Sequence, residues 1–591
     1  MHRSSKPTSR SLRRVAIAGA LVASCSPAAP PVHSPTAPAA SSAVPVAPKT
    51  VTLSILETND LHGRIDRLPV FAGYLKNLRA SREADHGGVV LVDCGDMFQG
   101  TLESNLGEGA AVIKIYNALG YTSATIGNHE FDYGPAGPLS TPHAATDDPR
   151  GALKARAQEA SFPFLVSNLV ETSTEKPLAL PNAAPSRVLE VAGIRVGIVG
   201  AASMETLRTT AHANVADLKL LPILPTVVKE AERLRTAEHA TVIVVALHAG
   251  ANCESTSNPR DLSSCTDGEL IKFARELPPG LVDVVVGGHT HHPVAHDVNG
   301  VAVIESWAQG RAFGRVDLSV DGATGRVTAR AIQPPKELCA DDRAATCEPG
   351  AYEGHPVVAD AAIAEAIKGD LQRAEAEKNR SLVAVVETPL TRARDKESAL
   401  GNLLTDLMRE ARAGTDVAVL NGGGIRANLP AGTLTYGALY EVFPFDNRFA
   451  KVKMKVAALK KLLASNLQAD AHFLSFSGVQ VVAKCGKGGL EIELRRTGGR
   501  KLNDDELLTV LASDFLMTGG DSVFAAVGVQ ESSVEIENDP PLREVLAEVL
   551  SRGTRKYSAE SLLPPGKPRL SYPGTRPVHC GTLPPPPVRP K

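Results

Sequence analysis

The stretch VTLSILETNDLHG, residues 51–63, decides what the first half of this chain can be. Its apolar run Val51–Glu57 is rich in β-branched side chains, which is typical of a strand buried within a sheet. Asp60 and His62 follow that run directly. In an extended segment, positions i and i+2 point the same way, so these two side chains can share one metal ion. The stretch therefore predicts a buried strand that carries two metal ligands at its carboxyl end.

Four more apolar runs end in residues of the same chemical kind. They are Val89–Cys94, Tyr121–Ile126, Val242–Leu247 and Val282–Val286. The polar residues that follow them are Asp96, Asn128 with His129, His248, and His289 with His291. Between the runs lie a further strand-like segment and two helical stretches: Val196–Gly200, Ala72–Ala80 and Pro222–Glu238. Because ligands of open α/β sheets gather outside the carboxyl ends of the strands, these runs predict one shared site.

The chemistry of these side chains indicates a pair of metal ions. Mixed carboxylate, imidazole and amide ligands suit Zn, Mn, Fe or Co rather than Ca. The candidates exceed what one tetrahedral ion needs, whereas two ions roughly 3.5–4 Å apart would use them all, with a carboxylate as the bridge. Each motif taken alone has a plainer interpretation as a capped turn. Five other histidines are interpreted as facing away, as surface residues or as hydrogen-bonded residues: His292, His143, His296, His355 and His472.

Length and composition indicate a globular protein with more than one domain. The chain has 591 residues, of which 43% are hydrophobic and 22% charged. That length is too great for one ordinary core, and those fractions are normal for a globular protein. The formal net charge is −2, so charge gives no reason to expect a nucleic acid polymer as a partner.

The N-terminal residues resemble an export signal. Residues 1–24 combine a basic head with the apolar run Val15–Ala23, which is too short to span a bilayer. They lead into VASC, which resembles the lipobox of bacterial lipoproteins, with Cys25 as the lipidated residue; an ordinary cleaved signal is the alternative. Residues 25–49, mostly Pro, Ala and Ser, are interpreted as an extended tether. We therefore expect a protein of the periplasm or cell envelope, attached to a membrane only through that lipid.

The other cysteines fit an oxidising compartment. The candidate pairs are Cys253 with Cys265, Cys339 with Cys347, and Cys485 with Cys580. Sequence alone leaves the connectivity open. Cys94 lies inside an apolar run, and we expect it to be a buried free thiol.

The second half of the chain begins with a change of character after residue 337. A polar, Cys-bracketed loop and the Ala-rich helical stretch Val357–Lys378 are interpreted as a connector, residues 338–380. A second mixed α/β pattern follows over residues 381–572, with helix Leu400–Arg412 and strands Asp416–Leu420 and Gly478–Ala483. The Pro-rich residues 573–591 are expected to be an irregular tail. Together with a first domain over residues 50–337, this pattern predicts two α/β domains.

One motif of the second half has a chemical meaning of its own. NGGGIR, residues 421–426, directly follows the predicted strand Asp416–Leu420. A glycine-rich turn exposes backbone N–H groups, and Arg426 adds a rigid fork for a phosphate or carboxylate. A plain glycine-rich turn explains these residues equally well. On their own, Arg394 would be a solvated charge, and Phe445 and Phe515 would belong to the core.

The ordered motifs of the first half resemble those of the calcineurin-like metallophosphoesterases. They are NDLHGR at 59–64, Gly95-Asp96, GNHE at 127–130 and GHTH at 288–291. From about residue 50 to 570 the chain resembles the 5'-nucleotidase/UDP-sugar hydrolase family. The resemblance implies an N-terminal αββα sandwich that holds two divalent metal ions and a C-terminal α/β domain that binds the substrate.

The resemblance also assigns roles to individual residues. It implies that Asp60, His62 and His291 hold one ion, that Asn128, His248 and His289 hold the other, and that Asp96 bridges them. His129 with Asp132 resembles the family's catalytic dyad. The implied substrate-binding residues are two phosphate arginines, the glycine-rich turn, two aromatic residues that clamp the base and an aspartate that meets the ribose: Arg394, Arg426, Asn421, Gly424, Phe445, Phe515 and Asp521. Residues 135–155 look like an insertion that could narrow access to the site.

The implied reaction is the release of phosphate from nucleotides by an exported, two-metal 5'-nucleotidase. Zn, Mn or Co would be the ions, and a metal-bridging hydroxide would attack phosphorus. His129 would protonate the leaving group or stabilise its charge, and Asp132 would orient the ring. The alternatives are a UDP-sugar hydrolase, a 2',3'-cyclic nucleotide phosphodiesterase, a hydrolase of a sulfur-transfer product, or a surface lipoprotein that binds nucleotides without hydrolysing them. The sequence carries no indication of an oligomeric state.

Overall fold

The computed structural model describes residues 50–339, 347–469, 473–537 and 540–580. The predicted export signal, the tether with Cys25, His472 and residues 581–591 of the predicted tail lie outside these ranges. Within them, no helix is both long enough and apolar enough to span a membrane.

Residues 50–337 form two β-sheets that pack against each other. The first sheet has the spatial order β15 (Val327–Glu337), β14 (Ala312–Asp321), β1 (Thr50–Thr58), β2 (Gly88–Asp93), β3 (Ser123–Thr125), β4 (Phe164–Leu165) and β6 (Ala183–Ala184). The second has the order β12 (Val294–Val298), β13 (Val301–Glu305), β11 (Val284–Val286), β10 (Val242–His248), β8 (Ile194–Ala202) and β7 (Ser186–Val191). Buried side chains of both sheets form one apolar layer between them, including Ile55, Val90, Val196, Val244 and Ile304.

The central strands of each sheet run parallel. In the first sheet β1 pairs with β2, β2 with β3 and β3 with β4; in the second, β8 pairs with β10, β10 with β11 and β11 with β13. The carboxyl ends of these strands therefore lie at one edge of their sheet. The five runs predicted as ligand-bearing strands are found as β1, β2, β3, β10 and β11, each within two residues of its predicted bounds.

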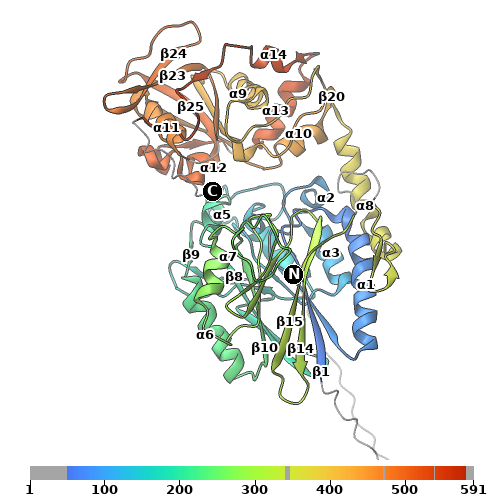
Figure 1. Cartoon of the computed structure of the whole chain (residues 1–591). Helices are drawn as coiled ribbons and strands as arrows, with labels where there is room; N and C mark the ends of the chain where they lie inside the picture. Colours follow the sequence, from blue (N-terminus) through green and yellow to red (C-terminus); the bar gives the residue numbers. More distant parts are fainter. Residues whose placement is uncertain (1–49, 340–346, 470–472, 538–539, 581–591) are drawn as a thin grey trace, which may run out of the picture. The chain divides into compact units, whose positions relative to one another are not determined.

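Helices cover the outer face of each sheet (Figure 1). On the first sheet lie α1 (Leu68–Ala84), α3 (Ala110–Leu119) and α4 (Gly151–Glu159), and on the second lie α6 (Ile223–Thr236) and α7 (Glu269–Glu276). Helix α1 is longer than the predicted Ala72–Ala80. Its buried residues include Leu68, Phe71, Leu75 and Leu78, which form a stripe at helical spacing over the first three turns. The result is the predicted αββα order of layers.

The connector packs against both halves of the chain. Its helix α8 (Ala361–Lys378) begins four residues later than predicted, because the Asp360 carboxylate caps it by accepting from the N–H groups of Ala362 and Ile363. Ile363 belongs to the same core cluster as α1 and α3, whereas Ala374 belongs to the main cluster of the second half. Short elements beside it are β16 (Ala351–Tyr352), β17 (His355–Pro356) and α2 (Leu102–Asn105). The boundaries 50–337, 338–380 and 381–572 remain predictions.

The second half is built on a five-stranded sheet with the order β22 (Leu474–Ser477), β19 (Val417–Asn421), β25 (Leu507–Ser513), β21 (Phe449–Lys455) and β26 (Glu535–Ile536). Alternate residues of β19 enter two different cores. Ala418 and Leu420 pack with α9 (Ala399–Ala411), α10 (Tyr436–Val442) and α13 (Leu542–Ser551), and Val417 and Val419 pack with α11 (Val456–Gln468). Smaller sheets are β20 (Gly432–Thr435), β18 (Ser381–Val386) and β27 (Lys556–Tyr557), and β24 (Gly489–Arg496), β23 (Val479–Gly486) and β28 (Leu570–Ser571).

The cysteines are paired as expected, and the C-terminal segment is packed against the rest of the chain. Disulfides join Cys253 to Cys265, Cys339 to Cys347, and Cys485 to Cys580, and Cys94 is a buried free thiol. Residues 573–580 contain no helix or strand, as predicted for a tail. They are nevertheless packed, because Val578 is buried in a core cluster and Cys580 is tied to β23.

Candidate functional site

The predicted metal ligands lie at the carboxyl ends of five strands, on the loops that follow β1, β2, β3 and β11 and, for His248, at the last residue of β10; we call these strand ends and loops the metal edge. The prediction that Asp60 and His62 lie in an extended segment is wrong. Both residues have a positive φ, of 49° and 48°, so their side chains meet through a turn. Backbone hydrogen bonds hold the turn against the loop after β2: Asp60 N–H donates to Gly95 O, and His62 N–H donates to Asp96 O.

Asp60, His62 and His291 form one cluster. The distance from His291 Nε2 to Asp60 Oδ1 is 3.4 Å, and from His291 Nε2 to His62 Nε2 it is 3.0 Å. Asp60 Oδ1 is buried and has no hydrogen-bond partner in the described structure. A buried carboxylate oxygen that accepts no hydrogen bond is costly. A cation at this position satisfies all three side chains.

A second cluster contains Asp96, His248 and His289. His248 Nε2 lies 3.2 Å from Asp96 Oδ2 and 3.3 Å from the side-chain oxygen of Asn128. Asp96 also belongs to a group with His62 and His129, so its carboxylate lies between the two clusters. Neither cluster alone contains all the predicted ligands, but together with Asn128 they contain each of them.

The ring orientations of two histidines suit ligation through Nε2. His62 Nδ1 donates to Gln99 O at 2.8 Å, and His248 Nδ1 donates to Cys94 O at 2.6 Å. Because a carbonyl can only accept, a neutral ring in either position keeps its lone pair on Nε2, which faces the cluster. Burial lowers the pKa of His248, but the Asp96 carboxylate outweighs it and raises that pKa to about 10, so His248 would give up its Nε2 proton on binding a cation. Burial, aided by nearby histidines, lowers the pKa of His62 to about 3 and that of His289 to about 4, so both rings are neutral at pH 7. The donor set therefore fits two divalent cations.

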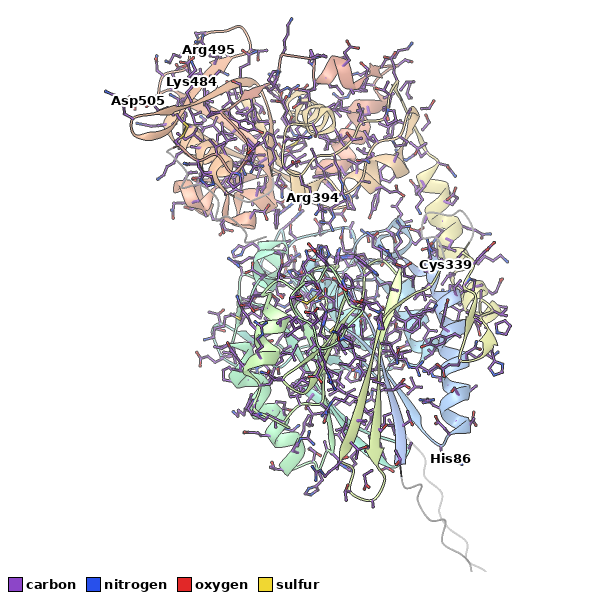
Figure 2. All side chains as sticks on the ribbon, in the orientation of Figure 1. His86, Cys339, Arg394, Lys484, Arg495 and Asp505 are labelled. Carbon is purple, nitrogen blue, oxygen red and sulfur yellow. A yellow bond between two sulfur atoms is a disulfide. The ribbon has the colours of Figure 1, made fainter. Side chains whose placement is uncertain are left out.

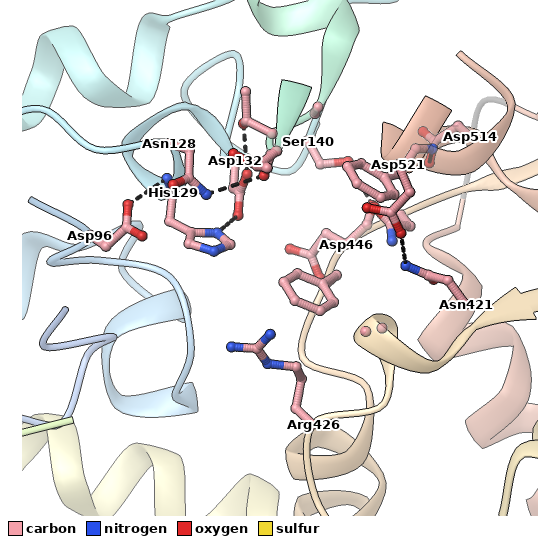
Figure 3. Close-up of a pocket in the computed structure, with 18 of the residues that line it drawn as sticks. Asp96, Asn128, His129, Asp132, Ser140, Asn421, Arg426, Asp446, Asp514 and Asp521 are labelled. Atoms are coloured by element: carbon pink, nitrogen blue, oxygen red, sulfur yellow. Dashed lines mark hydrogen bonds and ion pairs between the residues drawn. The ribbon is translucent and has the colours of Figure 1, made fainter. Parts of the chain in front are cut away.

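His129 and Asp132 form a hydrogen-bonded pair beside these clusters (Figure 3). His129 Nδ1 lies 2.5 Å from Asp132 Oδ2, and Thr210 donates to the other oxygen of Asp132 at 2.8 Å. The backbone N–H of His129 donates to Asp96 Oδ1 at 2.8 Å. Burial lowers the pKa of His129, but the carboxylates of Asp132 and Asp96 outweigh it and raise that pKa to about 9. The ring is therefore a proton donor at neutral pH.

Glu130 supports the metal edge, a role that the sequence did not predict; there it was only the last residue of the motif GNHE. Its buried carboxylate accepts three backbone N–H groups, from Asp96 at 2.8 Å, from Met97 at 2.7 Å and from Gly127 at 2.7 Å. These bonds join the loop after β2 to the loop after β3. The only sequence signal for this role was an acidic residue directly after a ligand pair.

A cavity of about 340 Å³ lies against the metal edge; we call it the central cavity. Its lining from the first half includes the dyad and part of both metal clusters: Asp96, Asn128, His129, Asp132, His289 and His291. Its lining from the second half includes every predicted substrate-binding residue: Arg394, Asn421, Gly424, Arg426, Phe445, Phe515 and Asp521. Asp60, His62 and His248 lie outside its lining.

The second-half residues come from four adjacent segments. Asn421 ends β19 and donates to Asp521 Oδ2 at 2.7 Å, and Arg426 lies below them in the glycine-rich turn (Figure 3). Phe445 follows α10, and Phe515 lies in α12 (Asp514–Met517). Both rings are only partly buried and line the central cavity, and Phe515 also packs against a core cluster.

The Phe445 ring links the two halves of the lining. It stacks with His129 at a centroid distance of 6.0 Å, and the Arg426 guanidinium lies 5.7 Å from its centroid. In the part of the chain that the structure describes, no hydrogen bond or ion pair engages the Arg426 guanidinium. Burial and the charge of Arg394 lower the pKa of Arg426, which indicates a cationic pocket with room for an anion.

The segment interpreted as an insertion also reaches the central cavity. Ser140 and Thr141 line it, and the Ser140 hydroxyl donates to Asp446 O at 3.1 Å. Of the histidines set aside, His292 lies near Trp307, with ring centroids 6.4 Å apart, and His296 is buried with its Nε2 3.1 Å from Ser255 O. His355 is exposed.

Two family models match the chain. The model of the calcineurin-like phosphoesterases matches residues 53–293, and that of the 5'-nucleotidase C-terminal domain matches residues 377–528. Among curated proteins, the chain is 25% identical to the protein UshA of Yersinia enterocolitica over 80% of this chain and 86% of that one. It is 26% identical to the endonuclease YhcR of Bacillus subtilis over 81% of this chain but only 38% of that one.

Solved structures show the same fold. The chain resembles a 5'-nucleotidase precursor from Thermus thermophilus with a TM-score of 0.64 and 24% identity. The likeness covers 88% of this chain and 99% of that one. The two halves therefore share the arrangement of a known two-part fold.

Proposed function

Because the chain belongs to the 5'-nucleotidase family of calcineurin-like metallophosphoesterases, we propose that this metal-dependent phosphoester hydrolase releases phosphate from nucleotides. One observation carries the proposal. A single cavity is lined on one side by the metal edge and on the other by Arg426, Phe445 and Phe515. A nucleotide offers the matching chemistry, since it joins an anionic phosphate to an aromatic base.

The metal edge is proposed to hold two divalent ions, with Zn, Mn or Co as the candidates. Asp60, His62 and His291 would hold one ion, and Asn128, His248 and His289 the other. Asp96 would bridge them, since its carboxylate lies in groups that include ligands of both ions. When bound, the ions supply positive charge at the phosphoryl oxygens and make water a nucleophile at neutral pH.

The dyad is proposed to serve the leaving group. His129 carries a proton at neutral pH and faces the central cavity, so it can donate to the ester oxygen as the bond to phosphorus breaks. Asp132 accepts from His129 Nδ1, which leaves Nε2–H as the free donor of the ring. Thr210 holds Asp132 in that position.

The second half is proposed to hold the substrate. Arg394 and Arg426 would bind phosphate oxygens, and Phe445 and Phe515 would stack on the base. Asp521 would accept from the ribose hydroxyls, oriented by its hydrogen bond from Asn421. Gly424 lines the cavity in the same turn, where the absence of a side chain lets a substrate approach the backbone.

We also propose that the protein is exported and acts in the periplasm or cell envelope, with Cys25 as a lipid attachment site. Three disulfides support an oxidising compartment. Mass spectrometry of the N-terminus of protein isolated from its native envelope tests this. A diacylglyceryl-modified Cys25 supports it, and an unmodified N-terminus elsewhere contradicts the lipid assignment.

A substrate panel tests the proposed activity. Phosphate release is measured with AMP, UDP-glucose and a 2',3'-cyclic nucleotide, each with and without a chelator. We expect release from AMP that the chelator abolishes and added Zn, Mn or Co restores. Turnover of UDP-glucose or the cyclic nucleotide alone would reassign the substrate. Nucleotide binding without any release, in metal-loaded protein, would leave a binding protein instead.

A further inference from the structure

The C-terminal segment, residues 573–580, is fixed beside the end of α11. Val578 is buried, and its N–H donates to Leu467 O at 2.9 Å. The disulfide from Cys580 to Cys485 ties the segment to β23. The segment predicted as an irregular tail is therefore anchored at Val578 and Cys580, with Arg576 between that anchor and β28.

Arg576 joins several backbone segments through one guanidinium. It donates to Asp395 O at 3.0 Å and to Asn466 O at 2.7 Å, and it lies over the Phe473 ring with its Cζ 5.4 Å from the centroid. Asn466 lies in the last turn of α11, whose carbonyls lack partners within the helix and favour a cation. A planar fork of donors suits this position, whereas a Lys ammonium is a single point charge.

The segments that Arg576 joins are those that carry Arg394 and the glycine-rich turn. Asp395 directly follows Arg394. The Phe473 N–H donates to Arg394 O at 2.8 Å, and Phe473 O accepts from Gly422 N–H at 2.8 Å. Arg576 thus contacts the Arg394 loop directly through Asp395 and indirectly through Phe473.

Arg394 depends on this backbone for its direction. Its side chain, labelled in Figure 2, is exposed in the loop before α9, and the described residues give its guanidinium no hydrogen bond or ion pair. It still lines the central cavity. The backbone of residues 394–395 sets the point from which this side chain reaches the cavity.

We propose that Arg576 is a positioning residue, which acts through Asp395 and Phe473 to set the direction from which Arg394 meets the phosphate of a bound nucleotide. This inference rests on the proposed function, since it takes Arg394 as a phosphate ligand. It gives the packed C-terminal segment and the Cys485–Cys580 disulfide a role in substrate binding. Arg576 lies outside the lining of the central cavity, although it lines a neighbouring pocket together with Arg394 and Asn421.

A double-mutant cycle in binding tests this. Two ligands are titrated calorimetrically into the full-length, metal-loaded protein: adenosine, and the phosphonate analogue of AMP in which a methylene replaces the scissile ester oxygen. Four variants are compared, R394A, R576A, R576K and the double variant R394A/R576A. The matched control is R552A, which removes an exposed arginine at the end of α13.

We expect R576A to weaken the phosphonate about tenfold and adenosine less than about twofold, with R576K between R576A and wild type. In the R394A background, R576A should add less than about twofold, because coupled residues are not additive. R552A should match wild type.

Three results would overturn the proposal. They are equal weakening of adenosine and phosphonate in R576A, losses that multiply in the double variant, or an R576A variant that binds the phosphonate normally. If R394A itself binds the phosphonate normally, the phosphate role of Arg394 in the proposed function fails along with this inference. If R576A unfolds, the test rests on R576K. Normal phosphonate binding by a folded R576K would also overturn the proposed role of Arg576.

Discussion

Several ligand residues hold backbone conformations that side chains rarely adopt. Asp60, His62, Asp96, His289 and His291 all have a positive φ, between 48° and 78°. Such conformations cost of order 1–3 kcal/mol each and persist only where the surroundings fix them. Here the backbone bonds between the loops after β1 and β2, and the three bonds to Glu130, provide that constraint. The residue types of the site could be predicted from sequence, but this geometry could not, because it depends on contacts between distant loops.

The Asp132 carboxylate gives the first prediction. In D132N the amide oxygen can still accept from His129 Nδ1–H, but the neutral amide lacks the negative charge that raises the pKa of His129. We expect kcat for AMP to fall about a hundredfold, with KM changed less than about threefold, as for loss of general acid catalysis. Steady-state phosphate release measures both constants. D66N, a change at an exposed carboxylate, serves as the control, and an unchanged kcat in D132N would contradict the dyad.

The Phe515 ring gives the second prediction. F515A removes one face of the proposed base clamp, and stacking is worth about 1–3 kcal/mol per base. We expect the dissociation constant of the AMP phosphonate to rise about tenfold, while F515Y retains near-normal affinity. Calorimetric titration of both variants measures this. Equal affinities in F515A and wild type would place the base elsewhere.

At the scale of elements, sequence periodicity located the strands better than the connections. Runs apolar on both faces predicted β1, β2, β3, β10 and β11 because a buried strand requires apolar side chains on both sides. The C-terminal segment is irregular, as predicted, and its candidate disulfide is present, but its Pro-rich composition gives no sign that Val578 is buried. Likewise, the sequence around Phe445 and Phe515 is that of core residues. Only the positions of α10 and α12 in the fold show that both rings line a cavity.

The connector helix gives the third prediction. Asp360 caps α8 by accepting from two N–H groups, at 2.9 Å and 3.1 Å. D360A should destabilise the protein by about 1 kcal/mol, whereas D360N keeps a good cap and should lose at most a few tenths. Urea unfolding of the two variants side by side measures the difference. Identical midpoints would show that the cap does not limit the stability of α8.

At the scale of the whole molecule, the two halves each supply what the other lacks. The metal edge crowds buried carboxylates and imidazoles, and Asp60 Oδ1 accepts no hydrogen bond from the described groups. The second half brings cations and aromatic rings to the same cavity. Bound ions should therefore stabilise the fold as well as serve the reaction.

Removal of metal gives the fourth prediction. A ligand present at a hundred times its dissociation constant stabilises the folded state by about 2.7 kcal/mol. We expect a chelator to lower the Tm of the wild type by several degrees and added Zn or Mn to restore it. In H62A/H248A, which lacks a predicted ligand of each ion, the chelator should change little. A Tm of the wild type that is independent of chelator would contradict a resident metal pair.

The proposed function requires that phosphate release takes place at a two-metal site bridged by Asp96. The most direct test is the rate of phosphate release from AMP by D96A beside the wild type, both supplied with excess divalent metal. We expect D96A to lose about a thousandfold or more of that rate, which corresponds to about 4 kcal/mol of transition-state stabilisation. Full activity in a folded D96A would contradict the two-metal site.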